Sequence, residues 1–445
     1  MDFRFFQELL SIDSTSGKER DVALWLSERL PDMFPASNRP ILRVEEVGDG
    51  TLNLLLTWGS PRIVFCSHLD TVPPYIPPTF PEGVEHDSDL DSFAPLGMTA
   101  TCHSKEVEDR RKNLIISEAS SVIPDEVPHV IPGLTGNLTG VIAGRGSCDA
   151  KGQVFAMISA CQRLAEEGCK DFGLLLLAGE ETGSLGAKAF AKTDFQAEYL
   201  VVGEPTDNCM VSASKGTKSF DLKFTGVPFH SGYPEHGLSA VDLFVEFVNA
   251  LKAKNFGIDP ILGKTTWNIG LLKSDNPQNI LSPELTCRIY FRTTFVSDEA
   301  VSAWMAAAPD LLRDGRPEPA MTEGAVPNST KDGRPEPTMT GSVIPGSTSP
   351  VIPGLTSPVI PGLTGNLTVT PRGGDTPARY WTVESLPSKS VAFGSDAPHL
   401  TNFKHKAICG PGSITVAHRD DEHVCVADLE TAVEQYVALY RVVTE

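Results

Sequence analysis

Two adjacent carboxylates, Glu180 and Glu181, follow a run of four leucines at residues 174–177 and the pair Ala178–Gly179. A continuous apolar run that ends in glycine and charge is typical of a buried parallel strand that carries acids to its C-terminal edge. Ligand sites of open α/β sheets lie at that edge. The same acids would also suit the first turn of a helix over residues 182–190. The two acids therefore indicate a ligand site only if other strand ends carry further groups that could bind the same ligand.

Several other predicted strand ends and loops do carry such groups. The candidate ligands are imidazoles and carboxylates, each placed after an apolar run or in a loop of the larger predicted domain: His68, Asp149, Glu180 with Glu181, Glu204 and His418. Nitrogen and oxygen donors of this kind suit zinc or cobalt, and the set is large enough for two ions that share one bridging carboxylate. The sequence therefore indicates a metal site at one edge of a sheet.

Composition excludes several classes of partner. The chain has 445 residues, 40% of them hydrophobic, which is enough for two ordinary domains. A formal net charge of −20 argues against nucleic acid and anionic membranes as partners. The N-terminus has no signal-peptide pattern, and the nine cysteines form no CxxC pair. We therefore expect a cytoplasmic globular protein with reduced thiols, whose partners are small molecules or neutral macromolecules.

Hydrophobic periodicity predicts an α/β protein with two domains. Helices are expected first, the second opened by a capping box of Ser16 and Glu19; strands and helices then alternate, which predicts a mostly parallel sheet with helices on both faces. From residue 211 the pattern changes to a smaller α+β unit. The predicted strands are 53–56, 63–66, 174–181, 199–202, 219–224, 265–271, 284–293 and 380–384; the predicted helices are 3–10, 18–30, 154–167, 184–191, 239–253, 298–308 and 427–442.

Two stretches rich in Pro, Gly, Ser and Thr interrupt this pattern, at residues 82–140 and 309–377. The decapeptide VIPGLTGNLT occurs in both, at Val130–Thr139 and at Val359–Thr368. These units are too short and too proline-rich to stack as a solenoid. We interpret them as disordered low-complexity inserts in surface loops, derived from a repeated in-frame element. The predicted domains are thus 1–210 with 386–445, and 211–385.

Seven segments together resemble the zinc amidohydrolases that include acetylornithine deacetylase, succinyl-diaminopimelate desuccinylase, aminoacylase and glutamate carboxypeptidase. They are SHLDTVPP, GRGSCDAKGQ, GEETGSLGA, VVGEPT, FHSGYPEHGLSA, FGSDAPH and GPGSITVAHRDDEHV. They occur in the family's order and cover nearly all of the chain outside the inserts. The resemblance implies a zinc-peptidase-like catalytic domain with an inserted ferredoxin-like lid and dimerisation domain.

The resemblance also implies a role for each candidate residue. Two zinc ions, for which cobalt can substitute, would share Asp149, with one ion completed by His68 and Glu204 and the other by Glu181 and His418. Asp70 would orient the His68 ring, and Glu180 would be the general base. His230 would reach an active site across a homodimer interface. Substrate contacts would come from Asn279, Arg292 and Ser395, although Arg288 on the same strand face could replace Arg292.

The predicted function is hydrolysis of the amide bond of a small N-acyl amino acid by a metal-bridged water. A dipeptidase or carboxypeptidase of the same family would use the same chemistry and remains open. An inactive metal-binding or carboxylate-binding homologue, disabled by the inserts, is a third possibility, because the stretch between His68 and Asp149 is longer than the family usually allows. The presence of Glu180 and Asp70 argues against it.

Overall fold

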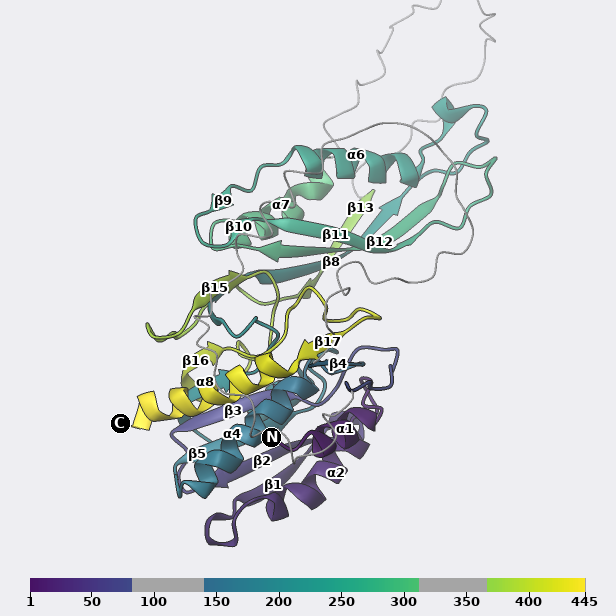
Figure 1. Cartoon of the computed structure of the whole chain (residues 1–445). Coiled ribbons are helices and arrows are strands. Elements are labelled where there is room, and N and C mark those ends of the chain that lie inside the picture. Colours follow the sequence, from purple (N-terminus) through teal and green to yellow (C-terminus); the bar gives the residue numbers. More distant parts are fainter. Residues whose placement is uncertain (82–139, 312–365, 445) are drawn as a thin grey trace, which may run out of the picture. The chain divides into compact units, whose positions relative to one another are not determined.

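The computed structural model describes residues 1–81, 140–311 and 366–444, which fall into two compact units (Figure 1). The larger unit comprises Met1–Gly216, Pro260–Gly263 and Asp375–Glu445, and the smaller unit comprises Thr217–Asp259 and Lys264–Gly374. These boundaries lie several residues from those predicted at 210/211 and 385/386. The reason is a small sheet of the larger unit, in which β7 (Met210–Ser214) pairs with both β14 (Ala378–Arg379) and β15 (Ser388–Val391).

A six-stranded sheet forms the centre of the larger unit. Its strands, in spatial order, are β1 (Ile41–Val47), β2 (Thr51–Trp58), β5 (Phe172–Leu177), β3 (Ile63–His68), β6 (Ala197–Val202) and β16 (Phe403–Ile408). Strands β5, β3, β6 and β16 run parallel to one another, whereas β2 runs antiparallel to both of its neighbours, β1 and β5. The sheet is therefore mostly parallel, as predicted, and strand β1 is an element that the sequence analysis missed.

Helices cover both faces of this sheet. Leu174 and Leu176 of β5 pack in a core with α1 (Phe3–Ser11), α2 (Arg20–Arg29), α4 (Lys151–Glu166) and α8 (Val426–Thr444). Leu175 and Leu177 belong to a second core with α5 (Leu185–Phe190). Successive side chains of a strand point to opposite faces of the sheet, and helices cover both faces. All four leucines are therefore buried. The apolar run that predicted a buried strand is explained by this double coverage.

The smaller unit is an α+β layer. Its sheet has the order β11 (Thr266–Lys273), β12 (Glu284–Thr293), β8 (Gly216–Thr225) and β13 (Leu367–Gly373). Alternate residues of β12 are buried against α6 (Ala240–Ala253) and α7 (Asp298–Leu311). Helix α6 begins at a Ser239 cap, whose hydroxyl oxygen accepts from the Asp242 amide at 3.4 Å.

Three details of the sequence analysis need correction. The smaller unit has no strand at 380–384 among its described residues; its last strand is β13, so the predicted insert at 309–377 overlaps ordered chain. The decapeptide at Val359–Thr368 ends inside β13, while the copy at Val130–Thr139 lies outside the described residues. The predicted capping box is wrong, because the Ser16 hydroxyl donates to Asp70 Oδ2 at 3.0 Å instead.

The described residues on either side of the gap at 82–139 are tied to each other. Thr79 and Ala143 exchange two backbone hydrogen bonds, of 2.8 and 3.0 Å. Ala143 ends strand β4 (Val141–Ala143), which pairs with β17 (His423–Cys425). The chain therefore leaves the described part of the larger unit and re-enters it at neighbouring points.

Candidate metal centre

The predicted ligands of the larger unit meet at the carboxyl ends of its parallel strands. His68 is the last residue of β3, Glu180 and Glu181 follow β5, and Glu204 follows β6 by two residues. Asp149 lies in the loop before α4, and His418 in the loop between β16 and β17. Because parallel strands end at a common edge, residues far apart in the sequence come together here.

Asp149 lies between the two imidazoles. Its Oδ1 is 3.1 Å from His68 Nε2, and its Oδ2 is 3.2 Å from His418 Nε2. His418 Nε2 is also 2.8 Å from Glu181 Oε1. One carboxylate thus faces a histidine with each of its oxygens, which is the arrangement that a bridging ligand requires.

Two ligand triads share Asp149. One ligand atom from each of His68, Asp149 and Glu204 lies within 4.8 Å of the others, and the same holds for Asp149, Glu181 and His418. The first triad is buried throughout, whereas the second runs from buried Asp149 to His418, whose side chain is 47% exposed. We call them the deep site and the outer site. His68, Glu180 and Glu181 form a further group within the same distance.

The charges at this edge favour cations. Glu204 is 4% exposed, and its Oε1 has no hydrogen-bond partner among the described residues. Burial raises the pKa of Glu204 well above its ordinary value, and the negative charges of Glu180 and Asp149 add to the shift. A buried carboxylate without a partner is costly unless a cation or a proton neutralises it. The donor set, nitrogen and oxygen without sulfur, fits zinc.

The carboxylates around the two imidazoles raise the pKa of each ring and so favour a proton where a cation would bind. Hydrogen bonds with Asp149 and then Glu181 raise the pKa of His418 to about 10. Burial alone would lower the pKa of His68, but its contacts with Asp149 and Asp70 raise it well above the ordinary value. Binding of a divalent ion would displace these protons, because a histidine ligand must be neutral at the coordinating nitrogen.

Asp70 holds both the His68 ring and the turn after β5. Its Oδ1 accepts from the Glu180 amide at 2.9 Å, and its Oδ2 accepts from the Glu181 amide at 3.2 Å. His68 Nδ1 lies 2.9 Å from the backbone oxygen of Asp70 and 3.5 Å from its carboxylate. The ring is thus held chiefly by the Asp70 backbone, while the carboxylate anchors the two acids, a role that the sequence did not indicate.

Glu180 is a carboxyl group with an unusual environment. Burial raises its pKa well above the ordinary value; the charge of His68 opposes this shift, while those of Asp396, Glu181 and Asp149 reinforce it. Gly179, with φ +67°, allows the sharp turn that separates Glu180 from the strand. A group with this environment beside two ligand triads is a candidate for proton transfer.

The loop predicted to contact substrate also lies in the larger unit. Ser395 is buried, and its Oγ accepts from the Ala397 amide at 3.3 Å. Burial raises the pKa of the neighbouring Asp396 to about 6, although a hydrogen bond from Ser184 opposes the shift. Asp396 Oδ1 has no partner among the described residues.

The remaining predicted site residues lie in the smaller unit. His230 forms an isolated β-bridge with Ile280, and the Ser231 amide donates to the Asn279 oxygen at 2.9 Å, so His230 and Asn279 are neighbours on an exposed surface. Arg288 is committed to Asp221 through two hydrogen bonds of 2.6 and 3.2 Å. The guanidinium of Arg292 instead lies 5.0 Å from the ring of Tyr290, which favours Arg292 for substrate.

Sequence analysis missed two residues near the ligands, Arg145 and Glu422. Both are buried and paired with each other. Glu422 belongs to the run Asp-Asp-Glu after His418–Arg419, which resembles a solvated charge cluster. The only signal that could have identified it is its position four residues after a candidate ligand, and this spacing is not specific.

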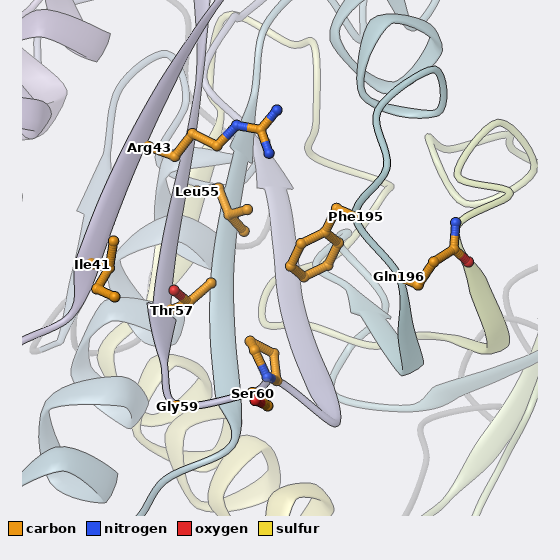
Figure 2. Close-up of a pocket in the computed structure, with 9 residues that line it drawn as sticks. Ile41, Arg43, Leu55, Thr57, Gly59, Ser60, Phe195 and Gln196 are labelled. Carbon is orange, nitrogen blue, oxygen red and sulfur yellow. The ribbon is translucent and has the colours of Figure 1, made fainter.

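A hollow of about 410 Å³ elsewhere in the larger unit does not contribute to this centre. Figure 2 shows Arg43 extending over Leu55 toward Phe195, with Gly59 and Ser60 at one side. Gly59 and Ser60 precede β3, whereas His68 ends it. The hollow is therefore lined from the end of the sheet opposite to the ligands.

Comparison with known proteins shows similarity to peptidases. The model of the M20 "Peptidase dimerisation domain" matches residues 212–318. A "Peptidase M20 domain-containing protein" of Sordaria macrospora is 26% identical, with 98% of this chain and 83% of that protein covered. A protein of Aspergillus clavatus named "Probable carboxypeptidase" is also 26% identical, over 98% of this chain and 87% of that protein.

A solved structure shows the same fold. The crystal structure of aminopeptidase PepT from Bacillus cereus superposes with a TM-score of 0.63 at 18% identity, covering 100% of this chain and 98% of that one. The predicted fold class is thereby confirmed. Residues 212–318 are thus similar to an M20 peptidase dimerisation domain, and the relatives named as M20 peptidases and carboxypeptidases point to a hydrolase that acts on amide bonds. These comparisons do not support the deacetylase subfamily in particular.

Proposed function

We propose that the protein is a dinuclear zinc peptidase of the M20 type that removes a C-terminal residue from short peptides. The observation that carries the proposal is the carboxylate of Asp149, which faces both imidazoles and belongs to both ligand triads. The carboxypeptidase names of relatives favour peptides over the N-acyl amino acids that the sequence first indicated. Deacylation of such amino acids uses the same chemistry and remains the second candidate.

The residues at the sheet edge would divide the work of holding two ions. His68, Asp149 and Glu204 would hold one ion in the deep site, and Asp149, Glu181 and His418 would hold the other in the outer site. When bound, the ions would polarise the scissile carbonyl and lower the pKa of an attacking water. The uncompensated charge of Glu204 is the feature that best supports a cation in the deep site.

Glu180 would act as the general base. Its raised pKa lets the carboxylate take a proton from the attacking water and hand it on to the departing amine. Asp70 would keep this group apart from its neighbour, because it holds the amides of both Glu180 and Glu181 and so fixes the direction of each side chain. One acid is then free for proton transfer while the next binds metal.

The smaller unit would supply substrate recognition. The planar fork of Arg292 suits the carboxylate of a peptide C-terminus, and Arg288 is already occupied by Asp221. His230 and Asn279 would contact the substrate carbonyl, with His230 reaching the site of a second subunit. The inserts of the chain do not remove any of these groups.

A homodimer is supported by the exposed apolar residues of the matched domain. Val241 and Val245 of α6 are 37% and 49% exposed, and Leu271 and Leu272 of the edge strand β11 are 71% and 56% exposed. Exposed apolar side chains on a helix and on an edge strand are typical of a surface that pairs with another chain.

The cytoplasm is the proposed compartment. All eight cysteines of the described part of the chain are free thiols, which suits a reducing environment. No helix in the described ranges is long and apolar enough to cross a membrane.

A hydrolysis screen tests the proposed function. Zinc-loaded protein is offered dipeptides and tripeptides with a free C-terminus, the same peptides as C-terminal amides, and N-acetyl and N-succinyl amino acids. We expect release of the C-terminal amino acid from the free peptides and little reaction with the amides. Cleavage confined to the N-acyl amino acids would replace the proposal with deacylation. Metal binding without any hydrolysis would indicate an inactive homologue.

A further inference from the structure

A buried ion pair lies beneath the loop that carries Asp149. Arg145 and Glu422 are 2% and 1% exposed, and Arg145 Nη1 is 2.5 Å from Glu422 Oε2. The other oxygen, Oε1, accepts three backbone hydrogen bonds, from the amides of Gly146 at 2.9 Å, Cys148 at 3.1 Å and Asp149 at 3.0 Å. A single carboxylate oxygen therefore fixes the backbone on which the shared ligand sits.

Arg145 connects this loop to two other segments near the ligands. Its Nε donates to the Pro74 oxygen at 3.1 Å, and its Nη1 donates to the Arg419 oxygen at 3.1 Å. Arg419 directly follows His418, and Pro74 lies four residues after Asp70. Three segments that carry groups of the metal centre are thus joined by one guanidinium.

General stability does not readily explain such a pair. Desolvating two charges is expensive, and well-packed apolar residues of similar size often stabilise a fold equally well or better. The pair does have a geometric effect, because its hydrogen bonds fix the Asp149 backbone relative to the segment that begins with His418. The groups that hold a ligand in place commonly tune metal affinity as strongly as some ligands do.

From this geometry we infer that Glu422, held by Arg145, is a positioning residue that sets Asp149 against His418 and thereby forms the outer site. The inference rests on the proposed two-ion function. It deepens that function, because it assigns the difference in metal affinity between the two sites to a pair of residues that binds no metal. The deep site depends less on the pair, since His68 and Glu204 are held by strand ends.

The decisive variant is Glu422→Gln. It preserves size but removes the charge and leaves one acceptor oxygen, so the side chain can no longer accept from both the three backbone amides and Arg145. We expect the outer ion to bind 10–100-fold more weakly and the deep ion, whose ligands His68 and Glu204 stay in place, to lose much less affinity. The readout is a cobalt titration followed by visible absorption, with chelator competition for each ion, and neither measurement requires catalytic activity.

A double variant separates positioning from stability. Arg145→Met combined with Glu422→Leu replaces the pair with apolar side chains, and we expect its thermal unfolding to stay close to that of the parent protein while the outer ion remains weakly bound. This variant also decides the matter if Glu422→Gln does not fold. The matched control is Glu434→Gln, which removes an exposed partner of Arg163 and should alter neither site.

The outcomes distinguish the inference from the proposed function. Wild-type affinity for both ions in folded Glu422→Gln, or recovery of the outer ion in the double variant, would show that the pair is only structural and would overturn the inference. If the parent protein itself binds fewer than two ions, the two-ion function fails and the inference fails with it. A loss of affinity that is much larger for the outer ion than for the deep ion, in both variants, supports it.

Discussion

The groups assigned to chemistry are held in two different ways. At the sheet edge of the larger unit, the Asp70 carboxylate accepts hydrogen bonds from two backbone amides, and His68, Asp149 and Glu204 are each at most 5% exposed. In the smaller unit, His230 and Asn279 are exposed. Buried groups with fixed partners are preorganised, whereas exposed ones gain their geometry when something binds. In the proposed function, metal binding and proton transfer would therefore depend on groups that the fold already holds in place, whereas recognition would be completed by the substrate and a partner subunit.

The largest expected effect comes from the base. Glu180→Gln should lower kcat by about 10²–10⁴-fold because the amide cannot take a proton. Both ions should remain bound, since Glu180 is not among the ligands of the two sites. Steady-state kinetics and elemental analysis check this. Glu430→Gln, which changes an exposed acid of α8, is the control, and an unchanged kcat in Glu180→Gln would exclude it as the base.

A smaller effect is expected from the residue that holds the acids in place. Asp70→Asn keeps one acceptor oxygen but sets an amide group against a backbone N–H, so the turn at Glu180 and Glu181 should shift. We expect a 10–100-fold loss of activity with a correspondingly weaker outer ion, measured by kinetics and chelator competition. Ser16→Ala, which removes only one donor to the Asp70 carboxylate, should lose much less. Equal losses in both variants would contradict this account of Asp70.

The exposed groups of the smaller unit should affect substrate binding more than turnover. Arg292→Lys removes a planar fork, and we expect KM for peptides with a free C-terminus to rise about tenfold, the cost of one charged hydrogen bond. Cleavage of amidated peptides should hardly change. Arg288→Lys is the matched control on the same strand, because its partner is Asp221. A larger rise in KM for Arg288→Lys would reverse the assignment.

The smallest effect is expected from the repeat region. Deletion of residues 341–365 should leave activity and thermal unfolding unchanged, if the second insert is dispensable. Deletion of 341–368 also removes Leu367, which is 3% exposed and pairs with Phe224 in the sheet. We expect only this longer deletion to lower the unfolding temperature, by several degrees. Equal destabilisation by both deletions would show that the insert itself supports the fold.

Much of the fold could be predicted from local pattern. The strand at the four leucines of β5 and the periodic helices α4, α6 and α8 could be predicted because burial on two faces, or on one helical stripe, leaves a recognisable pattern. Strand β1 was missed since it is an edge strand with mostly exposed residues and no such pattern. The place of residues 378–391 could not be predicted, because pairing with β7 is a tertiary choice.

The candidate site was predictable in its residue types but less so in its supports. His68, Asp149, Glu181, Glu204 and His418 were proposed as ligands, and the structure brings them together; their roles remain proposals. The hydrogen bonds from two amides to Asp70 and the ion pair of Arg145 with Glu422 could not be predicted. Each depends on backbone groups whose positions do not follow from the sequence. Sequence motifs identify the candidate metal ligands, whereas the hydrogen bonds that orient those ligands form only in the folded protein.

The paired backbone of Thr79 and Ala143 has a practical consequence for protein engineering. Because the two backbone segments are paired, a domain inserted between Pro81 and Gly140 needs only N- and C-termini that lie close together. This position is therefore a suitable insertion site. Ala143 adjoins the loop of Asp149, so a reporter domain inserted at this site would lie near the metal centre in sequence. The insertion would leave the hydrogen bonds between the Asp149 loop and Glu422 intact. Such a fusion would turn an apparent interruption of the gene into an attachment point for a sensor of metal loading.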